Sequence, residues 1–202
     1  MTLDKQVKEF VKARGIQKIV GFSGGINDLG IEISKIIFEA IEVFAKYPVA
    51  VLSGGTGFSV PLYAVNFAKR FSIPTIGIMP VKGEKYAIPS LDLKLVIEPR
   101  YLESEWGDES EIFAKLADGT IYVGGMYGTL IEYAHVMKIN QDRIKKNQEP
   151  IYVALIQNTG SILEPIHALS DKVMSQCFPE KPVYTGKDAA EFIIKKLFKM
   201  EE

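Results

Sequence analysis

The chain has 202 residues, enough for one domain with its own hydrophobic core and short for two. Its 24 basic and 25 acidic residues leave a formal net charge of −1, which argues against duplex nucleic acid as a partner. With one cysteine, Cys177, and two histidines, the chain holds no internal disulfide and lacks ligands for a usual zinc site. Its first 15 residues lack the apolar core of a secretory signal, and no apolar run is long enough to span a bilayer. We therefore expect a cytoplasmic protein with no membrane contact.

Apolar runs typical of buried strands recur along the chain, and most are followed by a glycine-rich or polar turn. We expect six strands, over residues 19–22, 48–52, 75–79, 93–97, 121–123 and 151–156. Helical spacing of apolar residues predicts helices over residues 31–44, 60–68, 109–117, 129–144 and 189–200. Asn27 or Asp28 is expected to cap the first of these helices.

The alternation of strands and helices defines the fold class. Several strands are apolar on both faces, as expected when helices cover both sides of a parallel sheet. We predict an α/β, Rossmann-like three-layer sandwich with a mostly parallel sheet of about six or seven strands. No internal repeat or linker divides the chain, so residues 1–202 form a single domain. The least regular stretch, 81–109, is typical of a functional loop.

Glycine clusters stand at the ends of three predicted strands. They read Ser23-Gly24-Gly25, Ser53-Gly54-Gly55-Thr56-Gly57 and Gly124-Gly125-Met126-Tyr127-Gly128-Thr129. Strand ends meet at one edge of a parallel sheet, and glycine lets backbone N–H groups approach an anion beside a helix N-terminus. The clusters therefore predict a phosphate site, with purely structural turns as the alternative. Their spacing matches neither a P-loop nor G-x-G-x-x-G, which disfavours a standard NAD dehydrogenase.

The third cluster and the helix behind it, from Gly124 to Glu132, resemble the P-G-G-x-G-T-x-x-E signature of the LOG (Lonely Guy) family of lysine decarboxylase-like proteins. That family belongs to the SLOG superfamily, together with the molybdenum-cofactor carrier proteins and several nucleotide sensors. The similarity covers about residues 19–156. It implies a Rossmann-like fold, a homodimer and a phosphorylated nucleoside or nucleotide as ligand, with the glycine loops holding the phosphate. It implies no metal and no cofactor.

The resemblance also implies an activity, hydrolysis of the N-glycosidic bond of a nucleoside 5′-monophosphate to base and ribose 5-phosphate. In the family, the glutamate that Glu132 matches acts where positive charge builds on the ribose carbon. The family's catalytic arginine falls on Glu109 when the residues are counted without a gap, and Arg100 is the upstream candidate to replace it. The candidate catalytic residues are therefore Glu132, Arg100 and Glu109.

Other functions stay open at this point. Glu109 in place of the arginine favours a non-catalytic nucleotide or cofactor carrier or sensor, whereas the retained Glu132 favours the enzyme. A ribosyl or deoxyribosyl transferase would use Glu109 or Glu132 as a covalent nucleophile. Thr129 and Glu132 also fit a capping box, in which the glutamate only satisfies the start of its helix.

Overall fold

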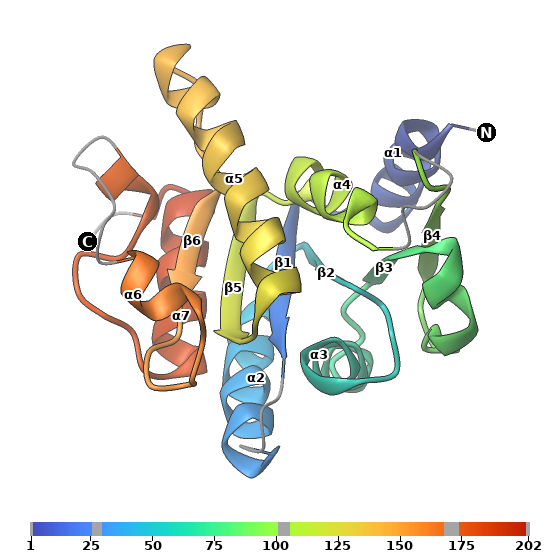
Figure 1. Ribbon diagram of the computed structural model, residues 1–202, viewed down its shortest axis with the longest axis horizontal. Helices are drawn as coiled ribbons and strands as arrows, with labels where there is room; N and C mark the ends of the chain where they lie inside the picture. The colour runs from blue at the N-terminus through green and yellow to red at the C-terminus, as the bar shows by residue number, and fades with distance from the viewer. Residues whose placement is uncertain (1, 26–29, 101–105, 168–173, 201–202) are drawn as a thin grey trace.

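The computed structural model describes residues 2–25, 30–100, 106–167 and 174–200 (Figure 1). Its sheet contains six strands: β1 (Lys18–Gly25), β2 (Val49–Ser53), β3 (Thr75–Pro80), β4 (Leu93–Ile97), β5 (Gly119–Gly124) and β6 (Tyr152–Leu155). The strand order is β4-β3-β2-β1-β5-β6, and every neighbouring pair is parallel. The predicted α/β three-layer fold and all six predicted strands are confirmed.

The helices form the two outer layers. They are α1 (Leu3–Arg14), α2 (Gly30–Phe44), α3 (Ser59–Arg70), α4 (Asp108–Leu116), α5 (Tyr127–Lys145), α6 (Leu163–His167) and α7 (Gly186–Leu197), with 3₁₀ turns η1 (Val81–Tyr86) and η2 (Met174–Cys177). Apolar residues of α2, α3 and α7 share one core with the sheet, whereas those of α1, α4 and α5 share the other. In Figure 1, α4 and α5 lie in front of the strands.

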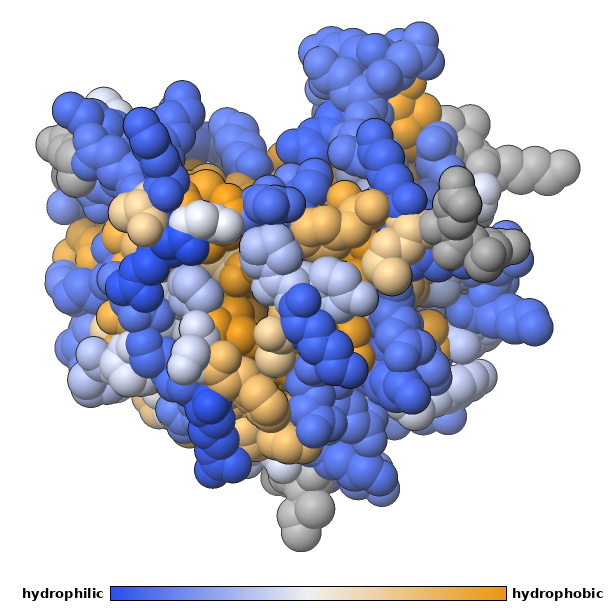
Figure 2. All heavy atoms as spheres, turned by 180° about the vertical axis from the view of Figure 1, so that it is seen from behind, coloured by the Kyte–Doolittle hydropathy of each residue, from blue (hydrophilic) through white to orange (hydrophobic). Residues whose placement is uncertain are grey.

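Successive strand side chains enter opposite cores, which explains why the strands are apolar throughout. Val51 belongs to the core under α2, α3 and α7, whereas its neighbours Ala50 and Leu52 belong to the core under α1, α4 and α5. On the face seen from behind, hydrophobic side chains gather near the centre and hydrophilic ones surround them (Figure 2). Among the described helices, none is both long and apolar enough to cross a membrane.

Several helical features differ from the sequence-based expectation, among them the short elements α6 and η2, which were not predicted, and the start of α7 at Gly186. Helix α1 was not predicted, although its apolar residues recur at helical spacing and Val7 is buried. Helix α5 begins at Tyr127, two residues before the predicted start, because it follows directly on the turn after β5. The irregular stretch 81–109 contains η1, which was not predicted, in addition to the predicted strand β4. The predicted capping residues Asn27 and Asp28 lie outside the described residues.

Candidate functional site

A cavity of about 310 Å³ opens at the carboxyl edge of the sheet, beside β1. Strand β1 lies between β2 and β5, and the helices that follow the neighbouring strands β1 and β5 cover opposite faces of the sheet, α2 one face and α5 the other. Such a switch point is where open α/β sheets bind ligands. The cavity is lined by the ends of β1 and β3, the loops after β2 and β5, the start of α4 with the turn before it, and the first two turns of α5. The lining residues are Gly24, Gly25, Gly54, Thr56, Ile78, Pro80, Trp106, Glu109, Met126, Gly128, Thr129 and Glu132.

The N-terminal ends of three helices border this cavity. Gly54 and Thr56 precede α3, Glu109 lies in the first turn of α4, and Gly128 and Thr129 lie in the first turn of α5. Unpaired N–H groups and the helix dipole make each of these ends attractive to an anion. Within the described parts of the chain, no lysine or arginine lines the cavity. Backbone N–H groups and threonine hydroxyls are therefore the available phosphate donors.

Glu132 brings an ionisable carboxyl group into the cavity. The hydroxyl of Ser23, a residue of β1 that is 3% exposed, donates a hydrogen bond to the Glu132 carboxylate. Part of the Glu132 side chain is accessible from the cavity, but the surrounding protein withdraws the carboxylate from bulk water. This burial raises its pKa from 4.5 to about 7; the Ser23 hydrogen bond opposes the rise and the charge of Glu109 adds to it. Near neutral pH, Glu132 can therefore donate or accept a proton.

The capping-box interpretation of Glu132 is wrong. The N-cap position of α5 is Met126, which makes no side-chain capping bond. Because α5 begins at Tyr127, Thr129 already lies inside its first turn, and Glu132 bonds across to Ser23 on β1 instead of to the start of its own helix.

A second carboxylate and an aromatic ring come from the turn that begins α4. The Glu109 Oε2 atom accepts a hydrogen bond of 2.8 Å from the N–H of Gly107, whose φ of 114° is a conformation that favours glycine. Trp106 lines the cavity and is 53% exposed. The Trp106 ring lies next to η1: a Cβ atom added to Gly83 would be only 3.3 Å from this ring. Two carboxylates and an indole ring therefore share one cavity.

Comparison with known proteins identifies the fold. No protein-family model and no curated protein matches the chain. A solved structure of TM1055 matches the chain in fold. The two chains are 19% identical, the match covers 89% of this chain and 99% of that one, and the TM-score is 0.70. The chain has the Rossmann-like fold of these solved structures. Two further matches, each 21% identical, are the molybdenum cofactor carrier protein of Chlamydomonas reinhardtii and the molybdenum cofactor binding protein of Rippkaea orientalis. For these, the covered shares are 91% and 88% of this chain and 99% and 95% of the other, with TM-scores of 0.67 and 0.63.

Within this Rossmann-like fold, Arg100 does not line the cavity. Its guanidinium pairs with the carboxylate of Glu111, and its backbone N–H donates to Asp108 Oδ2 over 2.8 Å. The second oxygen of Glu111 pairs with Lys115. Hydrogen bonds from Lys115 and Arg100 lower the pKa of Glu111. Arg100 is thus engaged on the outer side of α4, whereas Glu109 and Glu132 share the cavity.

Several of the remaining candidate residues do not line the cavity but lie in the strands and loops that form it. Ser23, Ser53, Gly55, Gly57, Gly124, Gly125 and Tyr127 are not among the lining residues. The buried Ser53 hydroxyl accepts a 3.2 Å hydrogen bond from the N–H of Gly55 and so shapes the loop after β2. Sequence analysis assigned no site role to Ile78, Pro80 or Trp106. Pro80 at the end of a predicted strand was the available signal, since strand ends line the ligand edge.

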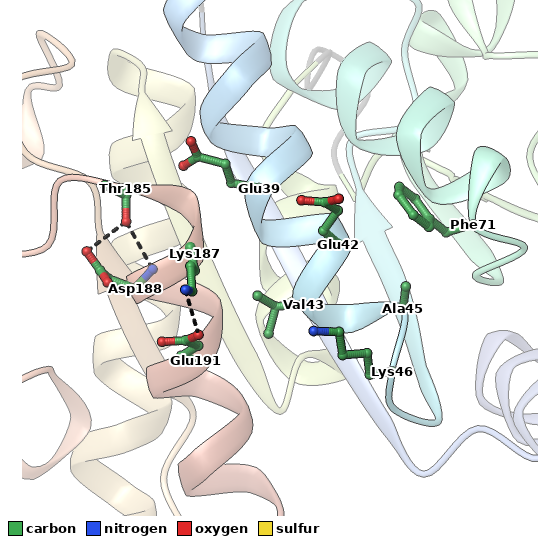
Figure 3. A pocket seen from close by; sticks show the side chains of 10 residues that line it. All are labelled: Glu39, Glu42, Val43, Ala45, Lys46, Phe71, Thr185, Lys187, Asp188 and Glu191. Atoms are coloured by element: carbon green, nitrogen blue, oxygen red, sulfur yellow. Dashed lines mark hydrogen bonds and ion pairs between the residues drawn. The ribbon is translucent and has the colours of Figure 1, made fainter.

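A larger hollow of about 660 Å³ lies elsewhere, on the surface between α2 and α7 (Figure 3). Charged side chains of both signs line it, including Glu42 on α2, Lys46 just after α2, and Lys187 and Glu191 on α7; the last two are 3.8 Å apart. It contains none of the glycine loops and no predicted site residue. The smaller cavity at the sheet edge is therefore the candidate functional site.

Proposed function

We propose that the protein binds a phosphorylated nucleoside in the sheet-edge cavity and hydrolyses its N-glycosidic bond. The observation that carries this proposal is Glu132, a carboxyl group with a pKa of about 7 inside a cavity built from glycine loops and helix N-termini. A volume of about 310 Å³ falls at the lower end of the range of small-molecule sites. The ligand's phosphate would lie against Gly54, Gly128 and Thr129.

The chemistry follows from the two protonation states of Glu132. As the C–N bond breaks, positive charge develops on the ribose carbon, and an ionised carboxylate beside it stabilises that charge. The base leaves with the electron pair of the C–N bond, and a water molecule forms the new C–O bond and gives a proton to the Glu132 carboxylate. Glu132 then passes this proton to the departing base, which returns the carboxylate to its ionised state. A group with a pKa near 7 can perform both transfers at neutral pH.

Glu132→Gln tests this proposal. We expect release of base from a nucleoside monophosphate to fall by about 10²–10⁴-fold, the usual contribution of a general acid–base group. Affinity should change little, because glutamine keeps the shape and still accepts the Ser23 hydrogen bond. Chromatography of released base and calorimetric titration measure the two quantities. Glu111→Gln, outside the cavity on α4, is the control that should keep both, and full hydrolysis by Glu132→Gln would disprove the role of Glu132.

A non-catalytic nucleotide or cofactor carrier is the second candidate. Two observations favour it: Glu109 takes the place of the arginine that the LOG resemblance implies, and two proteins of similar fold are a carrier and a binding protein of the molybdenum cofactor. A nucleotide that raises the melting temperature without releasing base would support the carrier.

We further propose that the protein is a cytoplasmic homodimer. Large apolar side chains are exposed beside or close to the cavity: Phe58, Tyr86, Met126, Tyr127 and Ile131. A cluster of this kind is typical of a surface that another protein covers. Light scattering coupled to size-exclusion chromatography should give twice the mass of the 22.5 kDa chain. The double variant Tyr127→Glu and Ile131→Glu should give the monomer mass, and a monomeric wild type would contradict the proposal.

A further inference from the structure

We propose that Glu109 and Trp106 recognise the base of the ligand and select guanine, whose Watson–Crick edge presents two adjacent N–H donors. The inference rests on the proposed function, because it assigns the ligand class of the same cavity. It concerns specificity and holds for either a hydrolase or a carrier.

The hydrogen-bonding character of Glu109 determines which edge of a base it can bind. A carboxylate only accepts hydrogen bonds, and its two oxygens offer about four acceptor positions. The N–H of Gly107 occupies one of these, on Oε2, so capacity for a ligand remains. No lysine or arginine lines the described cavity to neutralise the charge. The group that meets Glu109 must therefore be a donor.

Among the common bases, guanine alone presents two neighbouring donors on one edge, the N1–H and the 2-amino group. These match the two oxygens of a carboxylate in a bidentate arrangement. Adenine places an unprotonated ring nitrogen at the same position, and its lone pair would face those of the carboxylate. A matched bidentate contact discriminates against the wrong base by roughly 10- to 100-fold in affinity, which corresponds to about 1.4–2.7 kcal/mol.

Trp106 supplies the surface that holds the base next to Glu109. Trp106 is 53% exposed and lines the cavity, and its ring lies next to Gly83 in η1. Trp106 and Glu109 belong to the same turn, so a base stacked on the ring brings its edge toward the carboxylate. Stacking on an aromatic ring favours every base similarly. Trp106 thus contributes affinity, and Glu109 contributes the choice of base.

The chain offers a direct measurement, because Trp106 is its only tryptophan. Titration of the full-length protein with GMP, IMP and AMP should quench the intrinsic fluorescence as the base covers the ring. We expect GMP to bind about 10- to 100-fold more tightly than AMP. IMP keeps the N1–H donor but lacks the 2-amino group, so its affinity should fall between the two.

Glu109→Gln should reverse the preference. A glutamine amide offers one acceptor and one donor, the arrangement that adenine complements, so GMP should weaken and AMP should bind equally well or better. Glu111→Gln, on the same helix but paired with Arg100 and Lys115, should keep the preference for GMP. Trp106→Phe, followed by calorimetry, should weaken GMP and AMP by the same factor.

Two results would overturn the inference: equal affinity of the wild type for GMP and AMP, or an unchanged GMP preference in Glu109→Gln. In both cases nucleotides still bind, so the proposed function would stand. Binding of none of the three nucleotides would instead overturn the proposed function, and the assignment of Glu109 with it.

Discussion

Gly54→Val should abolish nucleotide binding in a protein that still folds, whereas Gly55→Val should fail to fold. Gly54 borders the cavity, and a Cβ atom there would lie 3.7 Å from Pro61 Cγ, an ordinary contact. Its φ is not positive, so valine meets no backbone strain. The branched side chain would occupy the space that a phosphate needs to reach the backbone N–H groups. We expect affinity to fall at least 100-fold, about 3 kcal/mol, with the melting temperature within a few degrees of the wild type.

Gly55 has the opposite character, although it is the next residue. Its φ is 65°, and a Cβ atom would lie 2.7 Å from Gly77 Cα, inside β3. The loop cannot move away easily, because the Gly55 carbonyl accepts a 2.9 Å hydrogen bond from the N–H of Ile88. The left-handed conformation adds about 1–2 kcal/mol of strain for valine. Circular dichroism should show an unfolded chain or a strongly lowered melting temperature.

Together, the variants Gly54→Val and Gly55→Val separate two roles of a glycine-rich loop, close packing and ligand access. Thermal unfolding reports the first, and titration with GMP reports the second. Normal GMP affinity in Gly54→Val would place the phosphate elsewhere. A folded Gly55→Val of wild-type stability would show that the loop is less closely packed against β3 than the contact with Gly77 implies.

The edge of the sheet was predictable from the sequence because parallel strands share their carboxyl ends. Apolar runs that stop at Gly or Pro are enough to place the loops containing Gly54 and Gly128 on one edge. The strand order was not predictable at this level. Ser23 and Glu132 are 109 positions apart in sequence, and they meet only because β5 pairs with β1.

The side-chain partners in the turn before α4 could not be predicted from the sequence either. Arg100 and Glu109 both lie in a polar stretch without periodicity, so spacing alone could not tell which of them faces the cavity. Which of the two faces the cavity depends on the three-dimensional turn. Gly107, with its positive φ, lies just before Glu109, which lines the cavity. Arg100 pairs with Glu111 and lies outside the cavity. Trp106 was also overlooked, because a lone exposed aromatic residue carries no pattern.

The Glu132 carboxyl group should lower the free energy of unfolding as the pH rises from about 4.5 to about 7. Its pKa is 4.5 in the unfolded chain and about 7 in the folded protein, so the folded state binds this proton more tightly. Below pH 4.5 both states are protonated and burial of the group costs little. Through the window between the two pKa values, the unfolded state loses its proton first. The loss of stability is complete above pH 7 and amounts to about 3 kcal/mol.

Glu132→Gln should remove this pH dependence, because the amide stays neutral and still accepts the hydrogen bond from Ser23. For a chain of this size, 1 kcal/mol corresponds to about 2–4 °C. We therefore expect the variant to melt about 6–12 °C above the wild type at pH 8 and at nearly the same temperature at about pH 4. Glu111→Gln serves as the control. It removes a carboxylate whose pKa is lowered, so it should not abolish the fall in melting temperature between pH 4.5 and pH 7. Parallel profiles for wild type and Glu132→Gln would mean that the Glu132 carboxylate is solvated. Glu132 would then lack the neutral-pH proton exchange on which the proposed hydrolysis depends.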